Sequence, residues 1–335
     1  MSASPSLWNR LKPDPFILMI IAAVVVAAIV PARGVGEDVL GVVTTAAIFL
    51  LFFMYGGRLA PAEALAGLTH WRLHLVILAF TFVVFPLVVL ALRPLSGPVL
   101  SPALYAGVLF CALVPSTVQS SIVFTSTAGG NVAGAIVSAS ASNLLGVVLT
   151  PLLVAFVMST SGASSGIDAS SVLDLFGQIL LPFVLGQLSR RWTARWLKEN
   201  HAWLKQVDRL VIVLVVYAAF SKGMNEGMWN LVGVRDLVVL TVILCGVLAL
   251  MLVATYESAR LLGFDRGDRI AIQFCGTKKS LATGLPMAVV LFAGQPVGLM
   301  VLPLMIFHQV QLMVCAVLAA RYGRQLGQDE VRAGA

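Results

Sequence analysis

One apolar stretch, residues 270–291, most constrains what this chain can fold into, because it places two lysines at the centre of a run long enough to cross a bilayer. Burying a lysine at that depth costs at least ~2.5–3.5 kcal/mol, and no carboxylate lies near Lys278 and Lys279 in the sequence. Residues that loosen or break helices flank the pair: Gly276, Gly284 and Pro286. We therefore predict a broken membrane helix whose break contacts protein or a wet cavity, as at the binding sites of transporters.

The composition excludes an ordinary soluble domain, because 59% of the residues are hydrophobic and only 11% are charged. The net charge of +7 does not indicate nucleic-acid binding, since the basic residues separate apolar runs and form no stripe. The four cysteines lie within apolar runs and show no metal-ligand spacing, which argues against a zinc site and a disulfide framework. We predict an all-α polytopic membrane protein without a cofactor.

Ten apolar runs are predicted to span the membrane, with the fourth and the ninth interrupted: 15–31, 38–55, 73–93, 101–127, 131–158, 171–190, 208–224, 235–260, 268–292 and 296–320. The first run is long for a signal peptide and no small-residue cleavage site follows, so we predict that it is retained. Segments 61–68 and 192–207 are predicted to be helices at the headgroup level, the second because tryptophans alternate with basic residues.

The basic residues orient the ten runs. Sixteen of the 22 Lys and Arg residues fall in the segments on the side of the N-terminus, four fall on the opposite side, and the other two are Lys278 and Lys279. Because basic residues concentrate on the cytoplasmic side, we expect both termini in the cytoplasm and the protein in the cell inner (plasma) membrane.

The two halves of the chain echo one another. Residues 128–134 follow the interrupted fourth run, and the similar segment 293–299 follows the interrupted ninth run 165 positions later. Five runs per half is an odd number, so a duplicated half is inverted in the membrane, and matching breaks in two such halves indicate a transport site. We therefore predict two five-helix repeats, residues 1–160 and 161–335.

The fourth run breaks at Pro115 and continues with a dense polar cluster: Ser116, Thr117, Gln119, Ser120 and Ser121. Such side chains offer oxygens to a hard cation or donors to an anion. Isolated serines in membrane helices usually bond back to their own helix. The proline, the density of the cluster and the matching break in the ninth run favour a binding role instead.

Polar residues in the fifth and ninth runs extend this candidate site. Ser138 and Ser142 lie one turn apart on one helix face, with Asn131 near the same stripe. Binding and close helix packing account for these small residues equally well, and both interpretations stay open. Around the lysines the ninth run adds Thr277, Ser280 and Thr283.

Adjacent positions on a helix point about 100° apart, so Lys278 and Lys279 need not do the same work. One ammonium can meet an anionic substrate. The other can occupy a cation pocket in place of a metal ion, or titrate if burial favours its neutral form. Snorkelling to water is disfavoured because eight or more apolar-run residues lie on each side of the pair.

The segments 115–121, 130–133 and 275–281 together resemble the bile acid:sodium symporter (SBF-like) family, in particular its bacterial bile-acid-symporter-like branch. The resemblance covers nearly the whole chain. It implies a panel domain made of helices one, two, six and seven, and a core domain made of helices three to five and eight to ten, in which broken helices four and nine cross. It also implies alternating access and two sodium ions bound beside the crossing.

Carried onto this sequence, the family's sodium ligands fall on or near Ser120, Ser121, Ser138, Ser142 and Gln273. The sequence departs from the family pattern at two of these positions, where Ser121 replaces an asparagine and Gln273 replaces a glutamate. Losing the carboxylate and gaining ammonium groups weakens the field that would hold sodium. We therefore expect at least one sodium position to be lost, with a lysine standing in.

The leading interpretation is a secondary transporter of a small organic anion, coupled to sodium or to protons. A monovalent cation/proton antiporter is the alternative suggested by an intramembrane lysine, although no paired aspartates lie at mid-membrane. Cys111 in the fourth run motivates an arsenite-type efflux carrier. An enzyme is not expected, because Ser280 lies too close in sequence to the lysines for a nucleophile–base pair on a helix.

Overall fold

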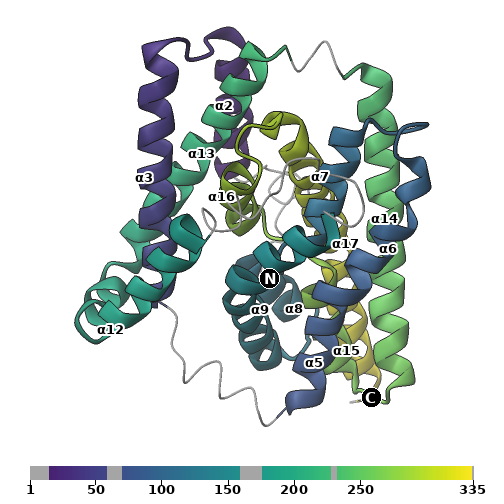
Figure 1. Cartoon of the computed structure of the whole chain (residues 1–335). Helices are drawn as coiled ribbons and strands as arrows, with labels where there is room; N and C mark the ends of the chain where they lie inside the picture. Colours follow the sequence, from purple (N-terminus) through teal and green to yellow (C-terminus); the bar gives the residue numbers. More distant parts are fainter. Residues whose placement is uncertain (1–14, 59–69, 159–175, 228–231, 334–335) are drawn as a thin grey trace, which may run out of the picture.

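The computed structural model describes residues 15–58, 70–158, 176–227 and 232–333, and these residues form helices and no β-strand (Figure 1). The first half contains α2 (Pro15–Ile29), α3 (Val35–Arg58), α5 (Trp71–Ala79), η2 (Phe80–Val84), α6 (Phe85–Ala91), η3 (Arg93–Leu95), α7 (Pro102–Leu113), α8 (Val118–Thr127), α9 (Val132–Leu153) and η4 (Val154–Met158). The second half contains η5 (Phe176–Leu180), α12 (Leu181–Glu199), α13 (His201–Asn225), α14 (Val234–Leu261), α15 (Arg266–Thr277), α16 (Leu281–Leu291) and α17 (Val297–Ala333).

Within the described residues, each of the ten predicted apolar runs coincides with helical structure, which confirms the all-helical class. In the described part of the chain, five continuous helical stretches are long and apolar enough to cross a membrane: Val35–Arg58, Trp71–Ala91, Val132–Met158, Val234–Leu261 and Val297–Leu326. The bent pair α7 and α8 makes a sixth if it is counted as one span. The protein is therefore a multi-pass membrane protein.

The segment 192–207 does not form a separate helix, so that prediction was wrong. It comprises the end of α12 and the start of α13, which meet at Asn200. Apolar periodicity alone missed this because both spans continue as helices into the basic, tryptophan-rich region. The tryptophans there are exposed: Trp192, Trp196 and Trp203. The other segment predicted at the headgroup level, 61–68, lies outside the described residues.

Four helices, α2, α3, α12 and α13, pack together on one side of the molecule (Figure 1). Where α3 lies along α12, Gly56 and Gly186 allow the backbones to approach, because a Cβ atom at either position would meet the backbone of the facing helix. Most of the remaining helices pack around α15 and α17. Helix α16 contacts α9 and α17 and also α13, so it connects the two groups.

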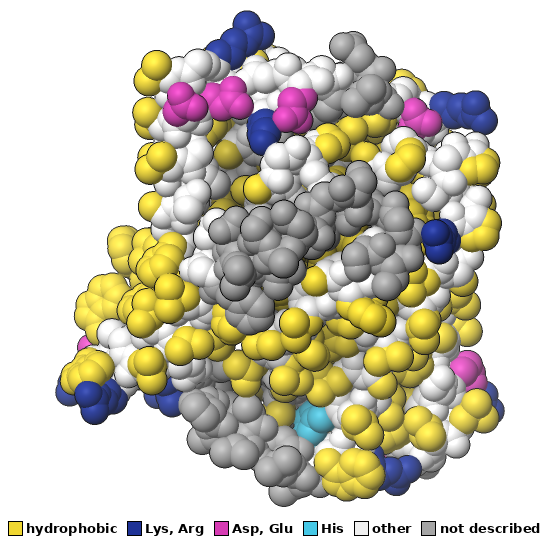
Figure 2. Space-filling model, viewed as in Figure 1, with side chains coloured by type: hydrophobic (Ala, Val, Ile, Leu, Met, Phe, Trp, Pro, Cys, Tyr) yellow, Lys and Arg dark blue, Asp and Glu magenta, His cyan; other side chains and the backbone are white. Residues whose placement is uncertain are grey.

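The visible surface is apolar across its middle, and most charged side chains gather at the two opposite ends (Figure 2). Large exposed hydrophobic residues on the spanning helices include Leu50, Leu75, Phe156, Val242 and Val317. Lipid contact accounts for such residues, because the bilayer core favours apolar side chains over the whole outer surface of a spanning helix.

Candidate functional site

The first break separates α7 from α8. Helix α7 ends at Leu113 because the next residue, Val114, precedes Pro115 and takes an extended ψ of 154°. Helix α8 begins at Val118 and is bent by 63° from α7. Pro115 therefore lies at the break, as predicted from the sequence.

The second break comprises Lys278, Lys279 and Ser280, between α15 and α16. Lys278 has an extended ψ of 152° and ends α15. Ser280 starts α16, and its Oγ accepts a hydrogen bond from the Thr283 N–H at 3.2 Å. The lysines are thus in extended backbone between two half-helices.

The two breaks meet at a point that we call the crossing, where hydrogen bonds join them. The Ser280 N–H donates to the Pro115 carbonyl at 2.8 Å, and the Ser116 hydroxyl donates to the Cys275 carbonyl at 2.6 Å. These bonds satisfy backbone groups that the broken helices leave without intrahelical partners. The crossing therefore has a defined geometry.

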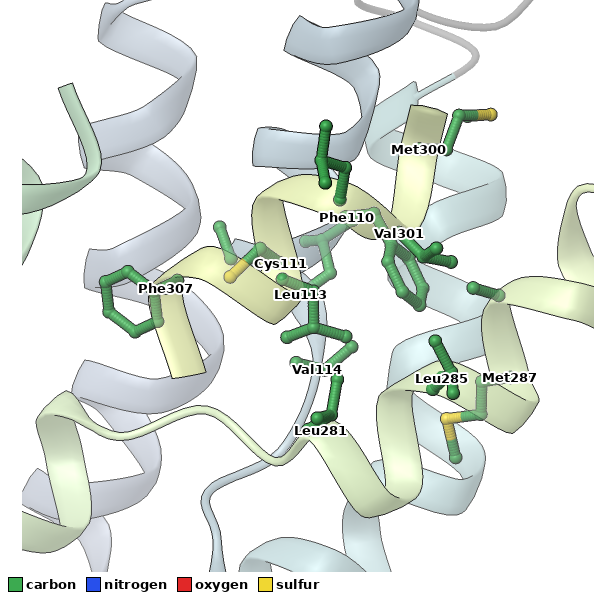
Figure 3. Packing of buried hydrophobic residues seen from close by; sticks show 14 of the residues in the cluster. Phe110, Cys111, Leu113, Val114, Leu281, Leu285, Met287, Met300, Val301 and Phe307 are labelled. Carbon is green, nitrogen blue, oxygen red and sulfur yellow. The ribbon is translucent and has the colours of Figure 1, made fainter. Parts of the chain in front are cut away.

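Buried apolar side chains from α7, α16 and α17 enclose the crossing on one side (Figure 3). In the close-up, Val114 at the end of α7 lies beside Leu281 at the start of α16, and Phe307 approaches from α17. All three side chains are buried. The polar groups of the crossing are consequently shielded from water on this side, which strengthens their electrostatic interactions.

Helix α9 holds the crossing from another side. The Ser142 hydroxyl accepts from the Ser116 N–H at 3.0 Å, and the Asn143 amide donates to the Ser116 carbonyl at 2.5 Å. The Thr283 hydroxyl donates to the Asn143 side-chain oxygen at 2.8 Å, which extends the network into α16. Both broken helices are therefore tied to the same turn of α9.

The Lys279 side chain ends in a cage of backbone carbonyls. Its Nζ donates to the carbonyls of Thr81 at 2.7 Å, Ala112 at 2.6 Å and Val114 at 3.0 Å. The Phe85 ring centroid lies 4.5 Å from the same nitrogen. The residue is 0% exposed, so all three ammonium donors are satisfied by protein groups.

The backbone of Lys279 is held by α17. Its N–H donates to the Gln311 side-chain oxygen at 2.8 Å, and its carbonyl accepts from the Gln311 amide nitrogen at 2.8 Å. The His308 ring Nδ1 lies 3.2 Å from the same carbonyl. Lys279 is therefore restrained at both its side chain and its main chain.

Lys278 points to a different environment. Its Nζ donates to the Ser120 carbonyl at 2.8 Å and lies 3.7 Å from the centroid of the Phe124 ring and 5.4 Å from that of Phe274. The residue is also 0% exposed. In the described part of the chain no carboxylate forms an ion pair with either lysine.

Several predicted site residues meet at the crossing: Pro115, Ser116, Ser142, Lys278, Lys279, Ser280 and Thr283. Ser121 also lies there, with its hydroxyl 3.4 Å from the Phe274 carbonyl that it donates to. Ser120 contributes its carbonyl to Lys278, and its hydroxyl donates to Thr117 Oγ1 at 3.4 Å. Gln119, on the same turn, is exposed.

Two predicted residues take part in a second polar region at the start of α9 and α15. The Asn131 side chain caps α9 by accepting from the Gly134 N–H at 2.8 Å and donates to Asp268 at 2.7 Å. The Ser138 hydroxyl lies 2.6 Å from Nδ1 of His74. These contacts join α9 to α15 and α5, away from the lysines.

Gln273 and Thr277 face α14. The Gln273 amide donates to the Leu252 carbonyl at 2.9 Å, and the Thr277 hydroxyl lies 3.2 Å from that of Thr255. The structure therefore places these two residues on the face of α15 that packs against α14, with Thr277 directly before the break.

The residues on which the resemblance places sodium ligands have the following hydrogen-bond partners in this structure. The hydroxyls of Ser120, Ser121, Ser138 and Ser142 bond to four different groups. The Gln273 amide nitrogen donates to α14, and its buried Oε1 has no hydrogen-bond partner among the described residues. Four carbonyl oxygens around the crossing, those of Ser120, Thr81, Ala112 and Val114, accept from the lysine ammonium groups.

Three residues predicted as helix breaks lie inside helices, which corrects that prediction. Gly276 is in the last turn of α15, and Gly284 and Pro286 are within α16. The glycines serve packing: a Cβ atom at Gly284 would lie 2.9 Å from Val114 Cγ1, and one at Gly276 would lie 3.2 Å from Phe80 Cβ.

Sequence reasoning missed the groups that hold Lys279, namely Thr81, Phe85 and Gln311. Gln311 had a detectable signal, because it is a polar residue within an apolar run, next to His308 at helical spacing. Thr81 acts through its backbone carbonyl, so its side-chain type carries no signal. Pro86 was the available clue, since it deprives the preceding turn of an N–H.

Comparison with known proteins places the chain in a defined family. The SBF-like CPA transporter family matches residues 14–324. An uncharacterized protein of Pseudomonas aeruginosa is 52% identical over 317 residues, which are 94% of this chain and 95% of the relative. The putative symporter YfeH of Escherichia coli is 49% identical over 315 residues, or 94% of each chain. The sodium/bile acid cotransporter 7 of Rattus norvegicus is 32% identical over 319 residues, or 93% of each chain.

Proposed function

This chain belongs to the SBF-like CPA transporter family, and we propose that it moves a small organic anion across the cell inner membrane by alternating access. Its family is one of transporters and not of enzymes, and its relatives include a putative symporter and sodium/bile acid cotransporters. The observation that carries the proposal is the pair of crossed helix breaks with two fully buried ammonium groups.

The proposed architecture is an inverted repeat of five spans. In support, the first half contains α2, α3, the α5–η2–α6 stretch, the broken α7–α8 span and α9. The second half contains α12, α13, α14, the broken α15–α16 span and α17 in the same order. The panel would comprise α2, α3, α12 and α13, and the core the remaining helices. The distribution of basic residues supports cytoplasmic termini.

The charges at the crossing favour an anionic substrate. Two ammonium groups lie there, and α8 and α16 both begin there, so the positive ends of two helix dipoles adjoin the break. Lys278 has one carbonyl and two rings around its ammonium, which leaves donors for a substrate carboxylate. Because Lys278 is 0% exposed, a substrate reaches it only when the surrounding helices move apart.

The test is binding followed by transport. Purified protein is screened by thermal shift against small organic acids, beginning with bile acids because of the relatives' names, in sodium and in choline buffers. The ligand is then followed into proteoliposomes under sodium and proton gradients. Uptake of an organic anion supports the proposal. Strict sodium dependence with two ions per cycle would contradict the altered sodium sites, and absence of any anion flux would contradict the function.

The cation/proton antiporter remains the second candidate, because the cations at the crossing are buried without a carboxylate partner in the described residues. Cation-driven proton flux without an organic anion would favour it. An arsenite-type carrier is the third, since Cys111 is buried in α7 near the break. Arsenite transport that persists in Cys111→Ala would remove the reason for that candidate.

A further inference from the structure

The carbonyl cage around Lys279 is a built cation site, and we infer that Lys279 is its permanent occupant, a tethered cation in a pocket that would otherwise bind a small monovalent ion. The inference deepens the proposed function, because the cage lies at the break where the proposed transport site is placed. Its central test measures cation binding and does not depend on transport.

The first carbonyl of the cage is freed by a local rearrangement of the α5–η2–α6 helix. In a regular α-helix the Phe85 N–H would bond to Thr81, but here it donates to the carbonyl of Phe80, one residue earlier. The next residue, Pro86, has no N–H to offer. The Thr81 carbonyl is therefore left without a partner from the following turn, and Lys279 Nζ takes that place.

The other two carbonyls are freed by the end of α7. Ala112 is within the last turn of the helix, where carbonyls have no intrahelical donor, and Val114 is in the extended break before Pro115. The C-terminal end of a helix also carries partial negative charge. Pro86 and Pro115 thus leave a group of unpaired carbonyls close together. This group would stabilise any small cation, whether a lysine ammonium or a free ion.

The chemistry of the cage matches a dehydrated monovalent cation. Neutral carbonyl oxygens replace water around such ions in selectivity filters, and an aromatic face adds cation–π attraction from Phe85. An ammonium on a four-carbon stem satisfies the same oxygens. Gln311 and His308 hold the Lys279 backbone in place, so the occupant cannot leave the pocket by a shift of the break.

Lys278 provides the internal comparison. Its acceptor, Ser120, lies within the first turns of α8, where the carbonyl also belongs to the helix's own hydrogen-bond pattern. Removal of Lys278 therefore leaves no cluster of freed carbonyls, and we expect no new cation site there.

The experiment compares wild type, Lys279→Ala and Lys278→Ala. Thermal unfolding of each purified protein is measured in choline chloride and with increasing sodium, potassium, ammonium or methylammonium chloride at constant ionic strength. We expect Lys279→Ala alone to gain a saturable rise in Tm of several degrees with at least one of these ions. The larger choline cation serves as the ion that the cage excludes.

Two outcomes overturn the inference. One is a folded Lys279→Ala protein whose Tm does not respond to any of the four ions. The other is an equal saturable response in wild type, which would mean that the ion binds elsewhere. If Lys279→Ala does not fold in choline, recovery of a monodisperse protein by purification in methylammonium supports the tethered cation, and failure of all four ions to recover it overturns the inference. Neither outcome contradicts the proposed organic-anion transport, which is tested by flux. Absence of anion flux, in turn, does not contradict the cation inference, which is tested by Tm.

Discussion

Lys278 and Lys279 are adjacent residues with the same side chain, yet their surroundings differ in kind. Lys279 is surrounded by three carbonyls that the fold has freed, and its main chain is held by Gln311. Lys278 has one carbonyl and two aromatic rings. The difference teaches that burial alone does not define a lysine's surroundings: protein carbonyls take all three donors of Lys279, whereas the Lys278 ammonium donates to a single carbonyl.

A third basic residue shows the more usual solution. Arg58, at the end of α3, forms a hydrogen-bonded ion pair with Asp208 of α13 at 2.5 Å, and both side chains remain partly exposed. There a carboxylate compensates the charge. At the crossing, oriented carbonyls and rings do so instead. Among the described residues no carboxylate pairs with these lysines, so none would compete there with the proposed anionic substrate.

The largest effect is expected from Lys279→Ala in choline buffer. The substitution leaves three buried carbonyls without a donor, and each such group costs about 1–3 kcal/mol, so the free energy of unfolding should fall by several kcal/mol. Thermal unfolding of the purified protein measures this, with exposed Lys198→Ala as the control. A variant as stable as wild type would show that the desolvation cost of the ammonium equals the free energy gained from its three hydrogen bonds. Lys279 would then be no more important for stability than Lys278.

Lys278→Ala is expected to change transport more than stability. Losing a charge-assisted hydrogen bond of about 1.5–3 kcal/mol should weaken binding of the organic anion by roughly 10- to 100-fold. Its Tm should fall less than that of Lys279→Ala, because Ser120 keeps its helical hydrogen bond. Anion uptake into proteoliposomes and Tm are measured together. Wild-type uptake by this variant would remove Lys278 from the binding site.

Gln311→Ala tests the restraint on the Lys279 backbone. It removes both partners of a buried N–H and carbonyl, so a loss of about 1–3 kcal/mol is expected. The matched control is Gln309→Ala, two residues earlier on α17, where a change near zero is expected. Equal Tm values for the two variants would show that the Gln311 hydrogen bonds do not hold the break.

An effect no larger than that of Gln311→Ala is expected from adding one methyl group behind the first break. A Cβ atom at Gly146 of α9 would lie 2.7 Å from the Pro115 ring, whereas one at Gly246 of α14 meets nothing within 4 Å. Gly146→Ala should cost about 1–3 kcal/mol by overpacking. Gly246→Ala should be neutral or stabilising by up to about 1 kcal/mol, because alanine favours helix. Thermal unfolding of the two variants measures the difference in stability. A Gly146→Ala variant as stable as wild type would indicate that the break at Pro115 can move.

Much of this protein follows from local sequence. Apolar runs of about 20 residues predict helices, because the backbone N–H and C=O groups of a chain that crosses a bilayer must be hydrogen-bonded within the chain. Pro115 ends its helix because a proline constrains the residue before it. The free-energy cost of two lysines in lipid predicts a second break in the ninth run. The sequence also predicts breaks at Gly276, Gly284 and Pro286, but these residues lie inside helices.

Tertiary structure decided which lysine faces which pocket and what holds it. The Thr81 carbonyl lies 198 positions from Lys279, and Gln311 lies 32 positions away. Backbone carbonyls are identical in every residue, so no sequence pattern marks the ones that will be freed and brought together. The sequence by itself predicts the polar residues and the two breaks. Which polar group pairs with which carbonyl depends on how the helices pack.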